Sequence, residues 1–104
     1  MTDEEQGYLQ TNTPQEILEK ACGLISGARA TQHGDYTVLH QKVASMWSAY
    51  LGHPVSGSEV AFCMALLKAA RSKVGSYNED DAIDGAAYTA LWGALDEAEK
   101  IKDS

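Results

Sequence analysis

The sequence has few cysteines and few basic residues, and each shortage argues against a class of protein. Two cysteines without CxxC spacing among 104 residues exclude a zinc motif and a disulfide framework. We expect Cys22 and Cys63, at apolar helical positions, to be buried reduced thiols. Eight basic residues against fifteen acidic ones give a net charge of −7, which argues against binding a nucleic acid polymer or an anionic membrane. A small anionic ligand held by a few local basic residues remains compatible with this charge.

Long apolar runs and alternating strand patterns are also absent. No run is long enough for a signal peptide or a membrane span, so we expect a cytoplasmic protein. No hairpin dipeptide or alternating run predicts a strand. The sequence therefore predicts an all-α fold, a compact four-helix bundle-like domain over residues 13–104 after a flexible N-terminus, residues 1–12.

Start and stop signals divide this domain into four helices. The first helix begins at a capping box, residues 13–16, and ends at Gly27, and the second begins at Asp35 and ends at Gly52. The third begins at a capping box, residues 56–59, and ends at Gly75, and the fourth begins at Asn78 with an acidic first turn. The inward stripe of the second helix would be Leu39, Val43, Met46, Trp47 and Tyr50. That of the third would be Val60, Cys63, Met64, Leu67 and Val74, and that of the fourth Ile83, Ala87, Ala90, Leu91 and Ala94.

Polar residues fall inside these apolar stripes, and this conflict points to a site. The polar residues at core-facing positions, where a charge must be paired or must face a ligand or water, are His40, Lys68, Arg71, Asp80 and Asp84. The alternatives are a hydrogen-bonded core histidine and a structural Arg71–Asp84 salt bridge. The candidate ligand-binding residues, with the loop before the second helix included, are Arg29, His33, Tyr36, His40, Trp47, Lys68, Arg71, Asp84 and Tyr88.

The third helix is apolar on more than one side. Phe62 and Leu66 lie off its main stripe, which predicts burial against a second surface and favours a homo-oligomer, since a chain this short gains stability from association. Motifs for phosphate loops, dinucleotide binding, zinc proteases and serine hydrolases are absent.

Four segments in this order resemble a known family. HGDY at 33–36, MWSAYLGHPV at 46–55, MALLKAARSK at 64–73 and DDAIDGAAY at 80–88 are similar to short, phage-borne, all-helical domains of unknown function, over roughly residues 17–92. The last segment also resembles the acidic helix of MazG-like all-α nucleotide pyrophosphohydrolases, which hold magnesium with an ExxE on one helix and an ExxD on another. Asp81 and Asp84 match one acidic pair, but the helices that would carry the other pair have His40 and Lys42, or Lys68 and Arg71, in its place.

This departure predicts binding rather than hydrolysis. Lys68 and Arg71 suit phosphate, and Arg71 can hold two oxygens at once. We expect no cofactor and no metal, and the non-catalytic sequestration of a small phosphorylated nucleotide in an infected bacterium. Such a protein resembles, in role, the phage sponges for cyclic-nucleotide immune signals (anti-CBASS proteins). One alternative is a magnesium-dependent MazG-like pyrophosphohydrolase with Asp81 and Asp84 as ligands, and another is a structural or host-protein interaction module. The base and the cyclic or linear form of the ligand are left open.

Overall fold

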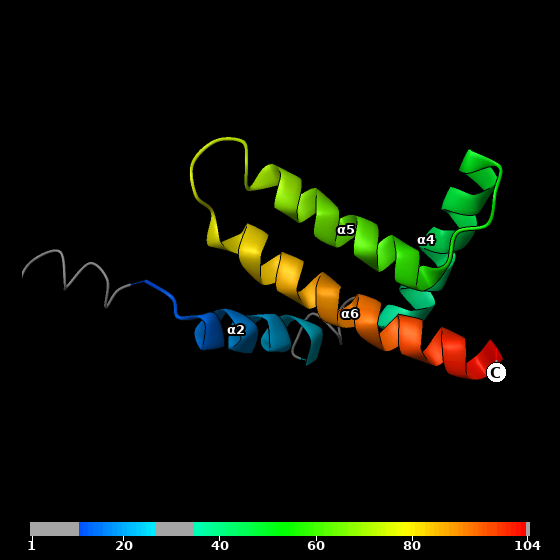
Figure 1. The fold of residues 1–104 in the computed structure, drawn as a ribbon, viewed down its shortest axis with the longest axis horizontal. Coiled ribbons are helices and arrows are strands. Elements are labelled where there is room, and N and C mark those ends of the chain that lie inside the picture. Colours follow the sequence, from blue (N-terminus) through cyan, green and yellow to red (C-terminus); the bar gives the residue numbers. More distant parts are fainter. Residues whose placement is uncertain (1–10, 27–34, 104) are drawn as a thin grey trace, which may run out of the picture.

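All regular secondary structure in the described part of the chain is α-helix. The computed structural model describes residues 11–26 and 35–103, so the predicted ligand residues Arg29 and His33 and the terminator Gly27 lie outside the described ranges. Its helices are α2 (Pro14–Ser26), α4 (Tyr36–Leu51), α5 (Gly57–Arg71) and α6 (Glu79–Asp103) (Figure 1). The predicted all-α class is confirmed. None of these helices is long and apolar enough to cross a membrane.

The first three helices, α2, α4 and α5, begin at the caps that the sequence predicted. The Thr13 hydroxyl accepts from the Glu16 amide at 3.2 Å, and the Glu16 carboxylate accepts from the Thr13 amide at 3.1 Å. The Asp35 carboxylate accepts from two amides of the first turn of α4. Ser56 and Glu59 form the second reciprocal capping box, at the start of α5. Side chains thus satisfy amides that a helix start leaves unpaired.

The end of α5 differs from the prediction. The helix stops at Arg71 instead of continuing to Gly75, because the Ser72 hydroxyl donates to the Ala69 carbonyl at 2.6 Å and the following amides form shorter-range turns. Gly75, with φ of 80°, then lies within the turn that leads to α6. Asn78 caps α6 as predicted, since its side-chain oxygen accepts from the Asp80 amide at 3.0 Å.

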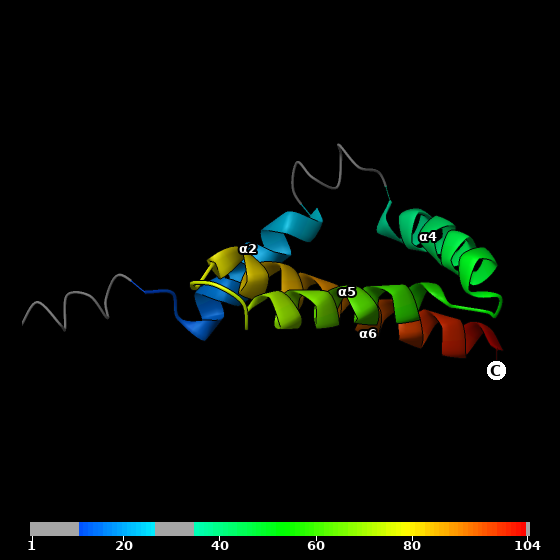
Figure 2. The ribbon, with the colours of Figure 1, turned by 90° about the horizontal axis from the view of Figure 1, so that it is seen from above.

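The α5–α6 hairpin is the centre of the fold. These helices pack along each other, α2 packs on α6 and α4 packs on α5. Figure 2 shows α2 and α4 on the same side of the hairpin. The opposite side, which we call the open face, is covered by neither of them. Two small core clusters hold the helices together: Ala21, Ile83 and Ala87 with Ile17, Leu24, Ile25 and Ala86, and Ala61, Leu91 and Leu95 with Ile25 and Tyr88.

The predicted inward stripe of α4 is wrong for three of its five residues, while Val43 and Trp47 are half-buried. Leu39, Met46 and Tyr50 are 46%, 71% and 90% exposed, whereas His40 and Ala44 are buried. The physical reason is that α4 packs mainly on α5, so one edge of the helix is covered and its apolar stripe is not. Periodicity identifies an apolar stripe, but it does not say what covers it.

Of the predicted inward stripe of α5, only Val60 is fully buried, and the rest of the buried side is made of small residues. Val60 and Ala61 are buried with Gly57 and Ser58, while Leu67 and Val74 are exposed. Both thiols, Cys22 and Cys63, are exposed, so their predicted burial is also wrong. On α6 the prediction is confirmed for Ile83, Ala87 and Leu91, but Ala90 and Ala94 are exposed, because the buried side continues to Leu95 instead.

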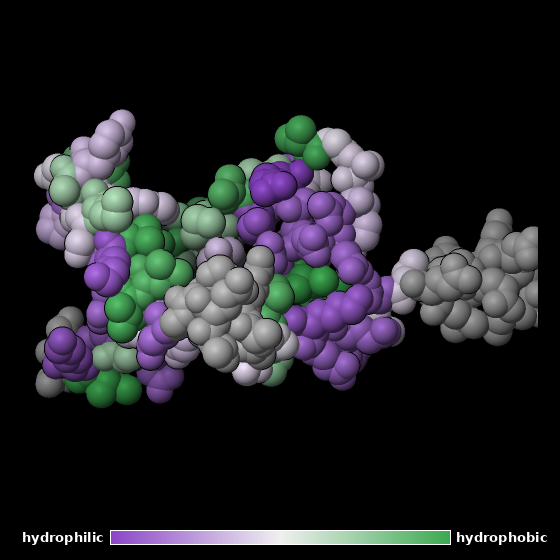
Figure 3. All heavy atoms as spheres, turned by 180° about the vertical axis from the view of Figure 1, so that it is seen from behind, coloured by the Kyte–Doolittle hydropathy of each residue, from purple (hydrophilic) through white to green (hydrophobic). Residues whose placement is uncertain are grey.

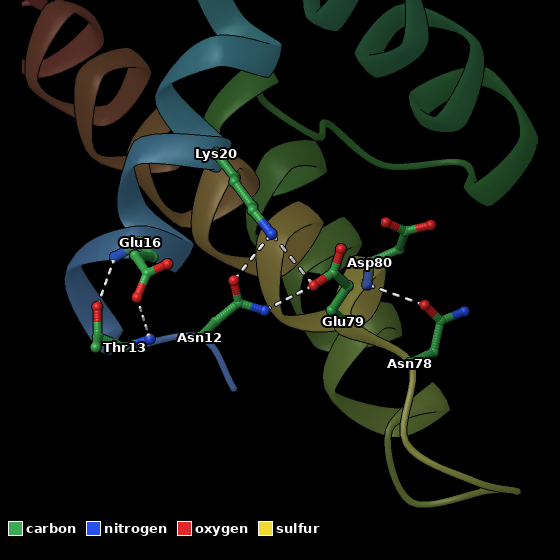
Figure 4. A network of polar contacts seen from close by, with 7 residues as sticks. All are labelled: Asn12, Thr13, Glu16, Lys20, Asn78, Glu79 and Asp80. Carbon is green, nitrogen blue, oxygen red and sulfur yellow. Dashed lines mark hydrogen bonds and ion pairs between the residues drawn. The ribbon is translucent and has the colours of Figure 1, made fainter. Parts of the chain in front are cut away.

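Polar contacts join the helices to one another at two places. Asn12 and Lys20 hold the Glu79 carboxylate at 2.6 and 3.3 Å, which joins α2 to the start of α6 (Figure 4). The amide of Asn12 is the larger cause, and Lys20 the second, of a pKa of Glu79 below its ordinary value. At the other end of the hairpin, the Ser58 amide and hydroxyl donate to Glu99 at 3.0 and 2.6 Å, so a carboxylate of α6 caps α5.

Candidate functional site

Two ion pairs join the facing sides of α5 and α6. Lys68 Nζ lies 3.2 Å from Asp84 Oδ2, and Arg71 Nε lies 3.8 Å from Asp81 Oδ1. The helices are antiparallel, so a step of three residues along α5 matches a step of three residues back along α6. We call these four residues the ion-pair seam. The two pairs neutralise two cations of α5 and two acids of α6, among them Lys68, Arg71 and Asp84, which the sequence placed at core-facing positions. Asp80, the remaining acid at such a position, is exposed.

The two pairs differ in burial. The side chains of Lys68 and Asp84 are only 15% and 21% exposed, so this pair is largely withdrawn from water. Asp81 is 10% exposed, but its partner Arg71 is 58% exposed. The expectation that Arg71 lies beside the core is therefore wrong. The alternative of an Arg71–Asp84 salt bridge is also wrong, because Arg71 pairs with Asp81. Arg71 is the last residue of α5, and its long side chain runs along the surface with Nε toward Asp81.

His40 and Tyr88 extend this polar row toward α4. Their ring centroids lie 6.3 Å apart in an edge arrangement, and Tyr88 also packs against the core cluster around Leu91. His40 is buried, and its Nδ1 donates to the Tyr36 carbonyl at 2.7 Å, which requires the proton on Nδ1. His40 is thus a hydrogen-bonded core histidine, the alternative left open by the sequence.

A hollow of about 330 Å³ lies on the open face beside the ion-pair seam. Its lining is Ala65, Lys68, Ala69, Ser72, Tyr77, Asn78, Asp81, Ala82, Gly85 and Thr89. The small residues of α5 and α6 leave the space, and polar side chains surround it. The volume is at the lower end of the range for ligand sites, roughly 300–1,000 Å³. Tyr77 is 78% exposed, so its ring is available for stacking.

The structure brings together only part of the predicted ligand set. Lys68 lines the hollow, Asp84 pairs with Lys68, and His40 meets Tyr88 one helical turn further along α6. Arg71 instead borders a second, shallower depression with Ala70 and Val74. Tyr36 is exposed and Trp47 half-buried on α4, and neither lines the hollow between α5 and α6.

Sequence reasoning missed most of the lining of the hollow. The sequence singles out neither Ser72 nor Tyr77 nor Thr89, and it predicts Asn78 only as the cap of the last helix. The signal that was available is the run of small residues at helical spacing on both helices, such as Ala65 with Ala69 and Ala82 with Gly85. Within residues 11–26 and 35–103, no group of three histidine, cysteine or acidic side chains is arranged to hold a metal ion.

Comparison with known proteins identifies the family. The model of DUF6378, a domain of unknown function, matches residues 16–96, and the chain belongs to this family. The chain is 37% identical over 76 residues to the Gene 55 protein of Mycobacterium phage L5 and 36% identical over 74 residues to that of Mycobacterium phage D29. The alignments cover 72% and 71% of this chain, which spans about half the length of the curated relatives it matches, 49% of each. No solved structure matches it.

These findings confirm the resemblance to phage-borne domains of unknown function. They do not show the likeness to MazG-like enzymes that residues 80–88 suggested, and they identify no catalytic family.

Proposed function

We propose that this member of the DUF6378 family binds a small phosphorylated nucleotide in the hollow between α5 and α6 and does not turn it over. The observation that carries the proposal is the position of Lys68, which lines the hollow while holding Asp84. An ammonium has three donors, so Lys68 can keep Asp84 and also donate to a phosphate oxygen. Tyr77 at the rim offers a ring on which a base can stack.

The acids beside the hollow favour binding over magnesium-dependent hydrolysis. Asp81 and Asp84 already face Arg71 and Lys68, and adjacent cations disfavour a divalent metal at the same carboxylates. The proposed role is a phage sponge for a cyclic-nucleotide immune signal in the cytoplasm of an infected bacterium. Its basis is the phage origin of the relatives together with a site that combines a cation, an aromatic ring and paired acids.

The test is a retention assay on the purified protein. Cyclic dinucleotides, cyclic trinucleotides and nucleoside triphosphates are each incubated with it, with and without magnesium, and then released by denaturation and analysed. The proposal expects one class to be retained and recovered intact. Magnesium-dependent turnover would support the pyrophosphohydrolase alternative, and no retention of any compound at high micromolar protein would refute nucleotide binding.

A pair of glycine variants makes this test specific for the hollow. A Cβ at Gly85 would lie 3.7 Å from the Lys68 Cβ, an ordinary contact, and it would occupy space in the hollow. A Cβ at Gly93, on the same helix, would have nothing within 4 Å. Both Gly→Ala changes should stabilise α6 by up to about 1 kcal/mol. Gly85→Ala should weaken retention while Gly93→Ala leaves it unchanged, and equal retention by the two would place the ligand elsewhere.

A second candidate function is a host-protein interaction module. Between Val60 and Ala70 the single charged residue, Lys68, turns toward α6, while Phe62 and Leu66 are 43% and 53% exposed. Phe62 also packs on Trp92 of α6, with ring centroids 5.1 Å apart. An uncharged apolar surface of this kind is typical of protein-binding sites. This function would be favoured if no nucleotide is retained and if the protein captures a defined host protein. The Leu66→Glu variant should then lose that capture.

A further inference from the structure

The exposed stripe of α4 has the spacing of a helix–helix seam. Tyr36, Leu39, Val43, Met46 and Tyr50 follow one another at alternating intervals of three and four residues. We call them the α4 stripe. Val43 is half-buried, and the other four side chains are 39–90% exposed. A repeat of 3.5 residues keeps apolar side chains facing a partner helix along the whole length of a helix.

The stripe is separate from the edge of α4 that already has a neighbour. His40 and Ala44 are buried on the α5 side of the helix, where the Cβ of His40 lies 3.5 Å from the position of a Cβ on Gly57. The stripe and this buried edge are adjacent on the helix surface, so α4 can keep its packing on α5 while a second helix covers the stripe. Viewed from behind, Figure 3 shows apolar and hydrophilic patches side by side on the α4 half of the molecule, whereas the α2 half is mainly hydrophilic.

The distribution of charge selects a second copy of this chain as the partner. With a net charge of −7, two copies repel each other over most of their surface. Among the four described helices, α4 alone contains no acidic residue, and its only lysine or arginine is Lys42. The open face is a poorer meeting place, because stacking two copies there would bring the acids of both α6 helices together.

We propose that two copies of the chain associate through their α4 stripes, around a two-fold axis close to Val43. Val43 is the middle residue of the stripe, so a self-complementary contact places it against its own copy. The 16-residue helix is about 24 Å long. A single helix pair of this length is a small contact beside the roughly 1,200 Å² at the lower limit of stable interfaces, so we expect a weak dimer with a micromolar dissociation constant. This contact leaves the hollow on α5 and α6 accessible.

Sedimentation of the full chain between about 1 and 500 µM tests the proposal. The wild type should shift from monomer to dimer within this range. Met46→Glu should raise the dissociation constant at least about 30-fold, because it puts a charge at the centre of an apolar contact. Met46 is 71% exposed, so the monomer should stay folded by circular dichroism. Leu66→Glu on α5 is the matched control, an exposed apolar residue made acidic on another surface, and it should dimerise normally.

A crosslink locates the axis independently. In a Cys22→Ser, Cys63→Ser background, which removes the two exposed native thiols, Val43→Cys should form a disulfide-linked dimer under mild oxidation. Leu66→Cys in the same background should not. A wild type that remains monomeric throughout, or a dimer that survives Met46→Glu, would overturn the proposal. Loss of the dimer with Leu66→Glu alone would also overturn it and would assign the contact to α5.

Discussion

The Lys68–Asp84 pair should respond asymmetrically to removal of its two partners. In Lys68→Met, the carboxylate of Asp84 loses its cation and stays only 21% exposed, within three residues of another acid, Asp81. In Asp84→Asn, the lysine keeps its charge, but its four-carbon chain can turn the ammonium into the neighbouring hollow and reach water. We therefore expect Lys68→Met to be the more destabilising change.

Burial sets the size of this effect. Exposed ion pairs contribute about 0–1 kcal/mol, and breaking a fully buried pair costs about 3–5 kcal/mol. The side chains here are 15% and 21% exposed, which places Lys68→Met between these limits, at about 2 kcal/mol. Asp84→Asn should cost about 1 kcal/mol or less. For a domain of this size, about 2 kcal/mol lowers the melting temperature by roughly 8–16 °C.

Urea unfolding followed by circular dichroism measures both variants and the double variant Lys68→Met, Asp84→Leu. The double variant should regain most of the loss, since replacing both charges by apolar groups removes the cost of burying them. A larger loss for Asp84→Asn than for Lys68→Met would refute the argument that the lysine can reach water. A loss below about 0.5 kcal/mol in both single variants would mean that water already solvates the pair.

Two further predictions concern the polar contacts at the ends of the hairpin. Glu99→Ala should cost about 1.5–3 kcal/mol in urea unfolding, because the buried Ser58 loses both of its acceptors on α6. The pKa of Glu79 is lowered in the folded state, first by Asn12 and then by Lys20, so its contribution to stability is present above the unfolded pKa and is lost as pH falls through the folded pKa. Melting temperatures from neutral pH into that acidic window should therefore fall less in Glu79→Gln than in the wild type.

The helices were predictable because their signals are local. The hydroxyl of Thr13 and the side chains of Asp35 and Ser56 satisfy amides two or three residues away, which any helical geometry requires. The choice of buried face was less predictable, because it depends on which helix lies opposite. Leu39 and Met46 form the stronger apolar stripe of α4, but α5 covers the edge that carries Ala44.

The candidate site was predictable in its chemistry but not in its pairing. The presence of cations on α5 opposite acids on α6 follows from helical periodicity, and the structure has both ion pairs. Which acid each cation pairs with depends on the register of the hairpin. That register could not be predicted, and α5 ends at Arg71 rather than at Gly75. That earlier end leaves Arg71 at the surface and brings Tyr77 from the turn to the rim of the hollow, which no local pattern indicates.

The acids of the seam also bear on which phosphate the hollow prefers. A phosphate near Lys68 approaches the carboxylates of Asp81 and Asp84. Each unit of negative charge on the phosphate, at about 4 Å from a carboxylate, is repelled by about 1–4 kcal/mol, depending on solvent access. A terminal phosphate carries about −1.5 to −2 charges at neutral pH, whereas a phosphodiester carries one. The site should therefore bind cyclic phosphodiesters more tightly than nucleoside monophosphates of the same base, by at least about tenfold in calorimetric titrations.

Asp81→Asn should narrow this difference in affinity, because it removes one of the repelling charges, while Asp96→Asn on the same helix should not. Tighter binding of the monophosphate would mean that the cation, rather than the paired acids, sets the charge preference of the hollow.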